Sequence, residues 1–162
     1  MVILGVDPGS LRTGYGAIDT DGRRHRLIEK GFLAASSRLA LPSRLRHIHE
    51  GLSELIVRLQ PDVLAVEDVF HAANTRTALV LGHVRGVVLL AGAEAGLPVH
   101  EFPPATVKQQ VTGFGRAEKQ QVAFMVARLL ELPGEGEAGD AADALAVALC
   151  HACLTLTAGI PS

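Results

Sequence analysis

Two runs of apolar residues that each end in a carboxylate constrain the fold of this chain more than any other feature. Residues 4–6 (Leu-Gly-Val) lead into Asp7, and residues 63–66 (Val-Leu-Ala-Val) lead into Glu67. Such unbroken runs are typical of strands in a sheet that helices cover on both faces. Because a carboxylate in apolar surroundings is costly unless it is paired or binds a metal, Asp7 and Glu67 are expected at a common edge of that sheet.

Apolar periodicity and turn signals predict the other elements. Three strands at the start of the chain, with a turn at residues 21–22, predict an antiparallel meander. The expected strands are residues 2–7, 13–19, 24–33, 63–66 and 99–102, and the expected helices are residues 42–60, 75–95, 105–112, 117–132 and 139–157. Interior glycines cost a helix roughly 1 kcal/mol each relative to Ala, so Gly82, Gly86 and Gly92 predict close packing against a neighbour, either the sheet or another subunit. Together these elements predict an α/β protein.

The length of the chain fits one domain that needs no disulfides. A chain of 162 residues can bury a sufficient core, so residues 1–162 are expected to form a single domain with a flexible tail at about 158–162. The longest apolar region, residues 78–97, contains Arg85 and Glu94, which argues against a membrane span. No signal peptide is expected, and the two cysteines resemble core thiols of a reducing compartment, so a cytoplasmic location is expected.

The net charge of −2 does not point to nucleic acid, but the charges are unevenly distributed. Residues 1–60 carry a charge of +3, and residues 61–162 carry −5. A protein that uses several acids to hold metal ions can be acidic in total and still present basic residues to phosphates. The charge balance therefore does not exclude a nucleic-acid substrate.

A second pair of acids opens the last expected helix. Asp140 and Asp143 are three residues apart, so they project from one face of the helix. Beside Asp7 and Glu67 they would complete four hard oxygen donors of the type that holds Mg²⁺ or Mn²⁺. The alternative is that they only stabilise the helix, because acids in the first turn interact favourably with the helix dipole.

Four separated motifs resemble those of one nuclease family. The motifs are residues 5–10 with 13–16, residues 65–70, residues 117–122 and residues 140–146. In this order and spacing, spread over nearly the whole chain, they resemble the RuvC family of Holliday-junction resolvases. The Asp7-x-Gly9 element alone also resembles the phosphate loop of actin-like and sugar-kinase ATPases.

The resemblance implies a ribonuclease-H-like fold, with a five-stranded mixed sheet in strand order 3-2-1-4-5 flanked by helices. It assigns catalysis and metal binding to four acids, which are Asp7, Glu67, Asp140 and Asp143. Some family members have His at the position that matches Asp140. It also implies two Mg²⁺ ions per subunit, with Mn²⁺ as an alternative, and a catalytic Lys119 near the scissile phosphate.

Three further residues are expected to bind DNA. Phe70 resembles the family aromatic that stacks on a base, which requires an exposed ring, although it could instead fold onto the core. Lys108 resembles a basic residue that contacts the phosphate backbone. Arg76 could contact phosphates from the loop that follows Phe70, or be solvated there.

The predicted function is that of a metal-dependent endonuclease, a crossover junction endodeoxyribonuclease of DNA recombination and repair. It would resolve four-way junctions by paired symmetric nicks that leave 5′-phosphate and 3′-hydroxyl ends. Because a junction is nearly two-fold symmetric, a homodimer is expected, with the helix that carries Gly82 and Gly86 as the candidate interface. The resemblance also implies the RuvA–RuvB branch-migration complex as a partner. Alternatives are a ribonuclease-H-like nuclease on RNA or hybrids, an actin-like ATP-binding domain, and a junction-binding module without catalysis.

Overall fold

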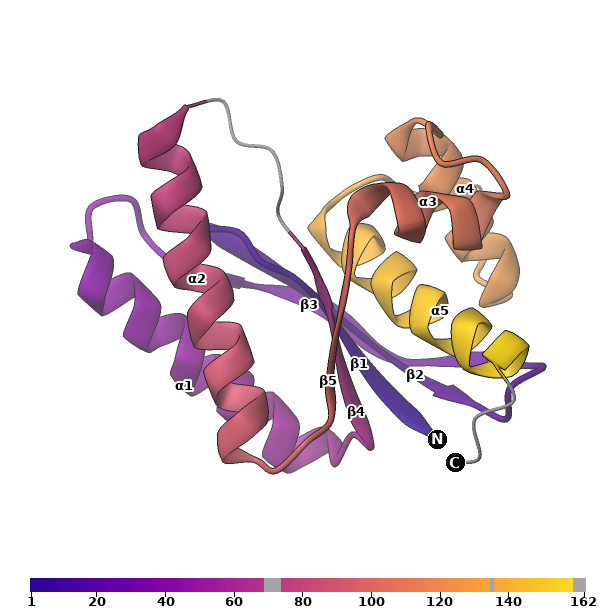
Figure 1. Cartoon of the computed structure of the whole chain (residues 1–162), viewed down its shortest axis with the longest axis horizontal. Helices are drawn as coiled ribbons and strands as arrows, with labels where there is room; N and C mark the ends of the chain where they lie inside the picture. The colour runs from indigo at the N-terminus through magenta and orange to yellow at the C-terminus, as the bar shows by residue number, and fades with distance from the viewer. Residues whose placement is uncertain (69–73, 135, 159–162) are drawn as a thin grey trace.

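In the computed structural model, which describes residues 1–68, 74–134 and 136–158, a mixed sheet is covered by helices on both faces (Figure 1). The strands, in the order β3-β2-β1-β4-β5, are β1 Val2–Asp7, β2 Arg12–Thr20, β3 His25–Ala34, β4 Val63–Glu67 and β5 Val99–Phe102. The helices are α1 Leu41–Leu59, α2 Thr75–Glu94, α3 Pro104–Thr112, α4 Lys119–Leu129 and α5 Asp140–Ala158. The predicted five-stranded sheet and its strand order are confirmed.

Helices α1 and α2 lie on one side of the sheet, and α3, α4 and α5 lie on the other (Figure 1). The central strand β1 pairs antiparallel with β2 and parallel with β4. Along β1, side chains alternate between the two faces, so Leu4 and Val6 pack with α1 and α2, while Ile3 packs with α5. The same alternation turns the next residue, Asp7, toward the face that α5 covers.

Helix α5 rests directly on the backbone of the two strands beneath it. A Cβ atom added at Gly5 would lie 2.1 Å from the carbonyl oxygen of Ala144, and one added at Gly14 would lie 2.1 Å from that of Asp140. Neither position has room for a side chain. These contacts fix the first turns of α5 against β1 and β2, close to the end of β1 that carries Asp7.

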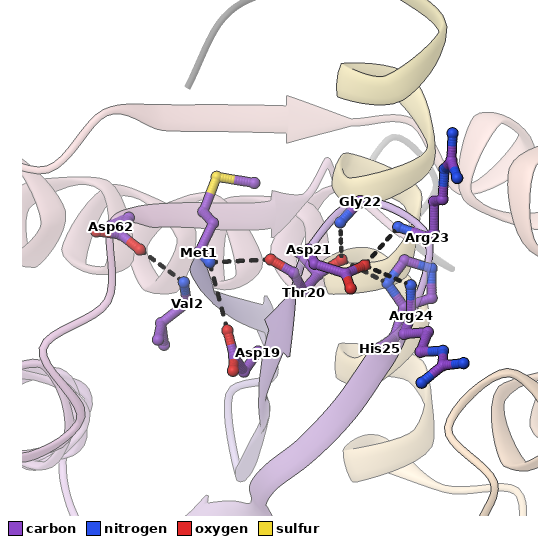
Figure 2. Close-up of polar contacts among 10 residues, drawn as sticks. All are labelled: Met1, Val2, Asp19, Thr20, Asp21, Gly22, Arg23, Arg24, His25 and Asp62. Carbon is purple, nitrogen blue, oxygen red and sulfur yellow. Dashed lines mark hydrogen bonds and ion pairs between the residues drawn. The ribbon is translucent and has the colours of Figure 1, made fainter.

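Polar contacts anchor the opposite end of β1 (Figure 2). The N-terminal ammonium of Met1 lies 3.3 Å from Oδ1 of Asp19, and the backbone N–H of Val2 donates to Oδ2 of Asp62 at 2.6 Å. Asp21 accepts two backbone hydrogen bonds within the turn between β2 and β3, at 2.8 and 2.7 Å. The turn therefore forms where residues 21–22 predict it.

The glycines of α2 divide between two environments. A Cβ atom added at Gly92 would lie 2.7 Å from the side chain of Leu64 and 2.8 Å from that of Val99, so close packing is confirmed there. At Gly82 and Gly86 an added Cβ would meet no atom of the described residues within 4 Å. The sheet is therefore the close neighbour of Gly92 alone, and for Gly82 and Gly86 packing against another subunit stays a prediction.

Helix α2 is, by length and composition alone, apolar enough to cross a membrane, with a mean hydropathy of 1.4. Its buried positions Val84, Val88 and Ala91 face the fold. Arg85 of the same helix forms ion pairs with Asp68, which follows β4, and with Glu101 of β5. These contacts are those of a helix that covers a sheet.

Helix α4 is shorter than predicted from the apolar pattern. It begins at Lys119 because Glu118 and Gln121 form a capping box, in which each side chain accepts a hydrogen bond from the backbone of the other residue. It ends at Leu129, and two residues later Glu131 adopts a left-handed conformation with φ of 53°. The cap places Lys119 at the first position of the helix.

Candidate active site

Asp7 and Glu67 lie side by side at the ends of β1 and β4. The parallel register pairs Val6 with Val66, so the next residue on each strand projects to the α5 face at the same level. The two carboxyl groups lie close enough to shift each other's pKa. Burial, followed by the charge of Asp143, raises the pKa of Asp7 to about 6, and burial, followed by the charge of Asp7, raises the pKa of Glu67 to about 8.

Asp143 and Lys119 complete the acid cluster from two helices. Asp143 lies in the first turn of α5, where its backbone N–H donates to the carbonyl oxygen of Gly139 at 2.9 Å. Nζ of Lys119 lies 2.8 Å from Oδ2 of Asp143, and this hydrogen bond raises the pKa of the lysine. The lysine side chain is 73% exposed, whereas the aspartate is 17% exposed. The ammonium group thus lies on the solvent side of the acids.

These side chains line one cavity of about 250 Å³. Its charged lining consists of Asp7, Glu67, Asp143, Lys119 and Lys108. A larger cavity of about 410 Å³, lined by the end of α3, the connection after it and α4, has no charged side chain in its described lining. The smaller cavity is therefore the candidate active site.

Asp140 is held elsewhere. Its Oδ2 lies 2.7 Å from Nε of Arg12, and Asp140 does not line the cavity. The guanidinium carbon of Arg12 in turn lies 3.7 Å from the centroid of the Phe32 ring. Sequence reasoning missed Arg12, because it is 128 positions from Asp140 and carries no local signal of this pairing.

The predicted DNA-binding residues have three different outcomes. Lys108, on α3, lines the cavity. Arg76 is exposed in the first turn of α2 and does not line it. Asn74 caps that helix by accepting a hydrogen bond from the N–H of Thr77 at 2.9 Å. Phe70 lies outside the described residues.

The donor set of the cavity fits a divalent metal ion. The three carboxyl groups that line it can supply the hard oxygen ligands that Mg²⁺ and Mn²⁺ prefer. In the part of the chain that the structure describes, no three His, Cys, Asp or Glu side chains are yet arranged around a common point.

A ribonuclease-H-like sheet with carboxylates at the ends of its two central parallel strands defines a nuclease of the ribonuclease-H-like class. A family model described as crossover junction endodeoxyribonuclease RuvC matches residues 3–151. The chain belongs to the RuvC family, as its motifs predicted. RuvC nucleases are metal-dependent.

Relatives and solved structures agree with this assignment over nearly the full chain. Crossover junction endodeoxyribonuclease RuvC of Desulforamulus reducens is 51% identical over 159 residues, covering 98% of both chains. The protein of the same description from Halorhodospira halophila is 53% identical over 150 residues, covering 93% of this chain and 89% of its own. The structure of Thermus thermophilus RuvC in complex with a Holliday junction substrate is 35% identical, with a TM-score of 0.91, and the match covers 98% of this chain and 96% of that one.

Proposed function

We propose that this protein resolves four-way DNA junctions by paired, symmetric, metal-dependent nicks. The observation that carries this function is the meeting of three acids and two lysines at one cavity. The acids are suited to bind metal ions, and the lysines are suited to bind a phosphate. Thermus thermophilus RuvC, which shares the fold at 35% identity, was solved with a Holliday junction substrate.

In this function Asp7, Glu67 and Asp143 hold Mg²⁺ or Mn²⁺, two ions per subunit, with Asp140 as the fourth ligand. When bound, such ions activate a water molecule for in-line attack and stabilise the departing 3′ oxygen, which yields 5′-phosphate and 3′-hydroxyl ends. Lys119 neutralises charge on the scissile phosphate.

Outside this centre, Lys108 contacts the phosphate next to the cut. Arg76 binds the backbone further along the arm, and Phe70 stacks on a base near the junction centre.

Two identical subunits would place two such centres on opposing strands. Helix α2 is the candidate interface, because Leu79 and Leu90 are 61% and 51% exposed and the space in front of Gly82 and Gly86 is open. Analytical ultracentrifugation tests this directly: Leu79→Glu should shift the protein from dimer to monomer. The proposed partnership with a RuvA–RuvB complex can be tested by pull-down on a junction.

The decisive experiment is nicking of a mobile four-way junction in Mg²⁺. The wild type should cut opposing strands at symmetric positions, and Asp7→Asn should bind the junction without cutting it. Asp19→Asn, at the far end of the same strand pair, is the matched control and should cut normally. Unchanged nicking by Asp7→Asn would defeat the proposed centre, and equal cutting of a linear RNA–DNA hybrid would favour a hybrid nuclease instead.

A further inference from the structure

Asp140 has its backbone beside the acid cluster and its side chain outside it. The Cβ contact described above sets the Asp140 carbonyl against Gly14, and Gly14 is the register partner of Asp7. The charge of Asp140 is close enough to contribute to the raised pKa of Asp7. Since the backbone is fixed, the direction of one short side chain decides whether Asp140 belongs to the cluster.

Two residues of the sheet determine that direction. Phe32 is the register partner of Gly14 on β3, so its ring lies on the same face as Arg12, two residues away on β2. The ring supports the Arg12 guanidinium at 3.7 Å, and the guanidinium holds Oδ2 of Asp140 at 2.7 Å. Among the described residues, Arg12 is the side chain that forms an ion pair with Asp140.

We propose that Arg12 is a positioning residue that keeps Asp140 out of the metal cluster until a divalent cation displaces it. The guanidinium group of Arg12 pairs with the Asp140 carboxylate and so takes the place of the divalent metal ion that this carboxylate would bind. The pair is partly exposed, at 54% for Arg12 and 35% for Asp140, and exposed ion pairs change an equilibrium by at most about fivefold. A divalent ion held by the other acids can overcome such a pair, so Arg12 weakens metal binding without preventing it.

Mn²⁺ binding to the protein without DNA tests this role, with free Mn²⁺ measured by electron paramagnetic resonance. Arg12→Gln should bind the more weakly held of the two Mn²⁺ ions about two- to fivefold more tightly than the wild type does. Arg46→Gln, which removes an equally charged residue from an exposed ion pair with Glu50 on α1, should not change the affinity. Equal affinities of Arg12→Gln and wild type would overturn the positioning role.

A double-mutant comparison separates positioning from simple charge removal. In an Asp140→Asn background, Arg12→Gln should leave Mn²⁺ affinity unchanged, because the residue through which Arg12 acts is gone. The same tightening in that background would mean that Arg12 acts only by repelling the cation, and would overturn the inference. Phe32→Leu, which keeps the charge of Arg12 but removes its support, should also tighten binding.

The role of Arg12 rests on the metal-dependent cleavage proposed above, and different results would refute each of them. Absence of Mn²⁺ binding to the wild type would refute both. Normal Mn²⁺ binding and junction nicking by the wild type, together with unchanged binding by Arg12→Gln, would refute the role of Arg12 alone. Thermal melts in EDTA should show Arg12→Gln as stable as Arg46→Gln, since both side chains are largely exposed.

Discussion

Replacing Asp7 by Asn should make the metal-free protein more stable while abolishing its nuclease activity. In the unfolded chain the carboxyl group ionises with its ordinary pKa of 3.8, whereas burial and the charge of Asp143 raise that pKa to about 6 in the folded protein. The folded state therefore binds the proton more tightly, and stability falls as the pH rises from about 4 to above 6. A neutral Asn of nearly the same shape avoids this loss.

The pKa values set the size of the effect. A rise from 3.8 to about 6, at about 1.4 kcal/mol per unit, gives a gain of about 3 kcal/mol for Asp7→Asn at pH 8. The gain should fall to about half near pH 5 and to about a fifth at pH 4, and it should vanish only below about pH 3, where Asp7 is protonated in both states. For a chain of this length, about 3 kcal/mol corresponds to a rise in melting temperature of roughly 6 to 12 °C. Removal of the Asp7 charge also lowers the pKa of Glu67, which adds in the same direction.

Urea denaturation followed by circular dichroism, in EDTA at pH 4, 5 and 8, measures this gain. Asp19→Asn is the control, because it removes an exposed aspartate that pairs with the N-terminal ammonium and should be neutral or slightly destabilising. If Asp7→Asn were destabilising at pH 8, or gave the same gain at pH 4 and pH 8, the burial cost assigned to this carboxylate would be wrong.

Three further outcomes follow from the same geometry. Mg²⁺ should raise the melting temperature of the wild type at pH 8 but not at pH 5, because pKa values of about 6 and 8 keep Asp7 and Glu67 protonated at pH 5. Differential scanning fluorimetry measures this shift. An equal shift at both pH values would mean that these acids are not the ligands. Lys119→Met should lower the single-turnover nicking rate by about 10²-fold. The same change at exposed Lys30 should leave the rate unchanged. Similar rates for the two variants would mean that Lys119 takes no part in catalysis. Gly14→Ala should lower the free energy of unfolding by about 1–3 kcal/mol, because the added Cβ would meet the Asp140 carbonyl. The control Gly82→Ala, on the open side of α2, should not destabilise the protein. No loss of stability in Gly14→Ala would show that α5 is free to shift.

The central carboxylates were predictable because their signal is local. An apolar run fixes a buried strand, and the residue that follows it is carried to the sheet edge, so Asp7 and Glu67 could be identified one at a time. The parallel pairing of β1 with β4 then brings them together. The strand order itself came from the family resemblance, since nothing in the local pattern decides which strands are neighbours.

The orientation of Asp140 could not be predicted in this way. Helical spacing places Asp140 and Asp143 on one face, but an ion pair with Arg12 on β2 turns the first away from the cavity while the second enters it. That choice depends on a contact across 128 positions and on the ring of Phe32. The start of α4 differed for a similar reason, because side-chain capping rather than apolar periodicity decides where that helix begins.

The contact of α5 with Gly5 and Gly14 also bears on how such a site can change over evolution. Because the helix is held by the backbone beneath it, the position of Asp143 does not depend on the length of the connection between α4 and α5. A lineage could therefore gain or lose residues in that connection while its acid cluster kept the same geometry. The two glycines, by contrast, leave no such freedom, so the site should tolerate insertion far better than the addition of one methyl group.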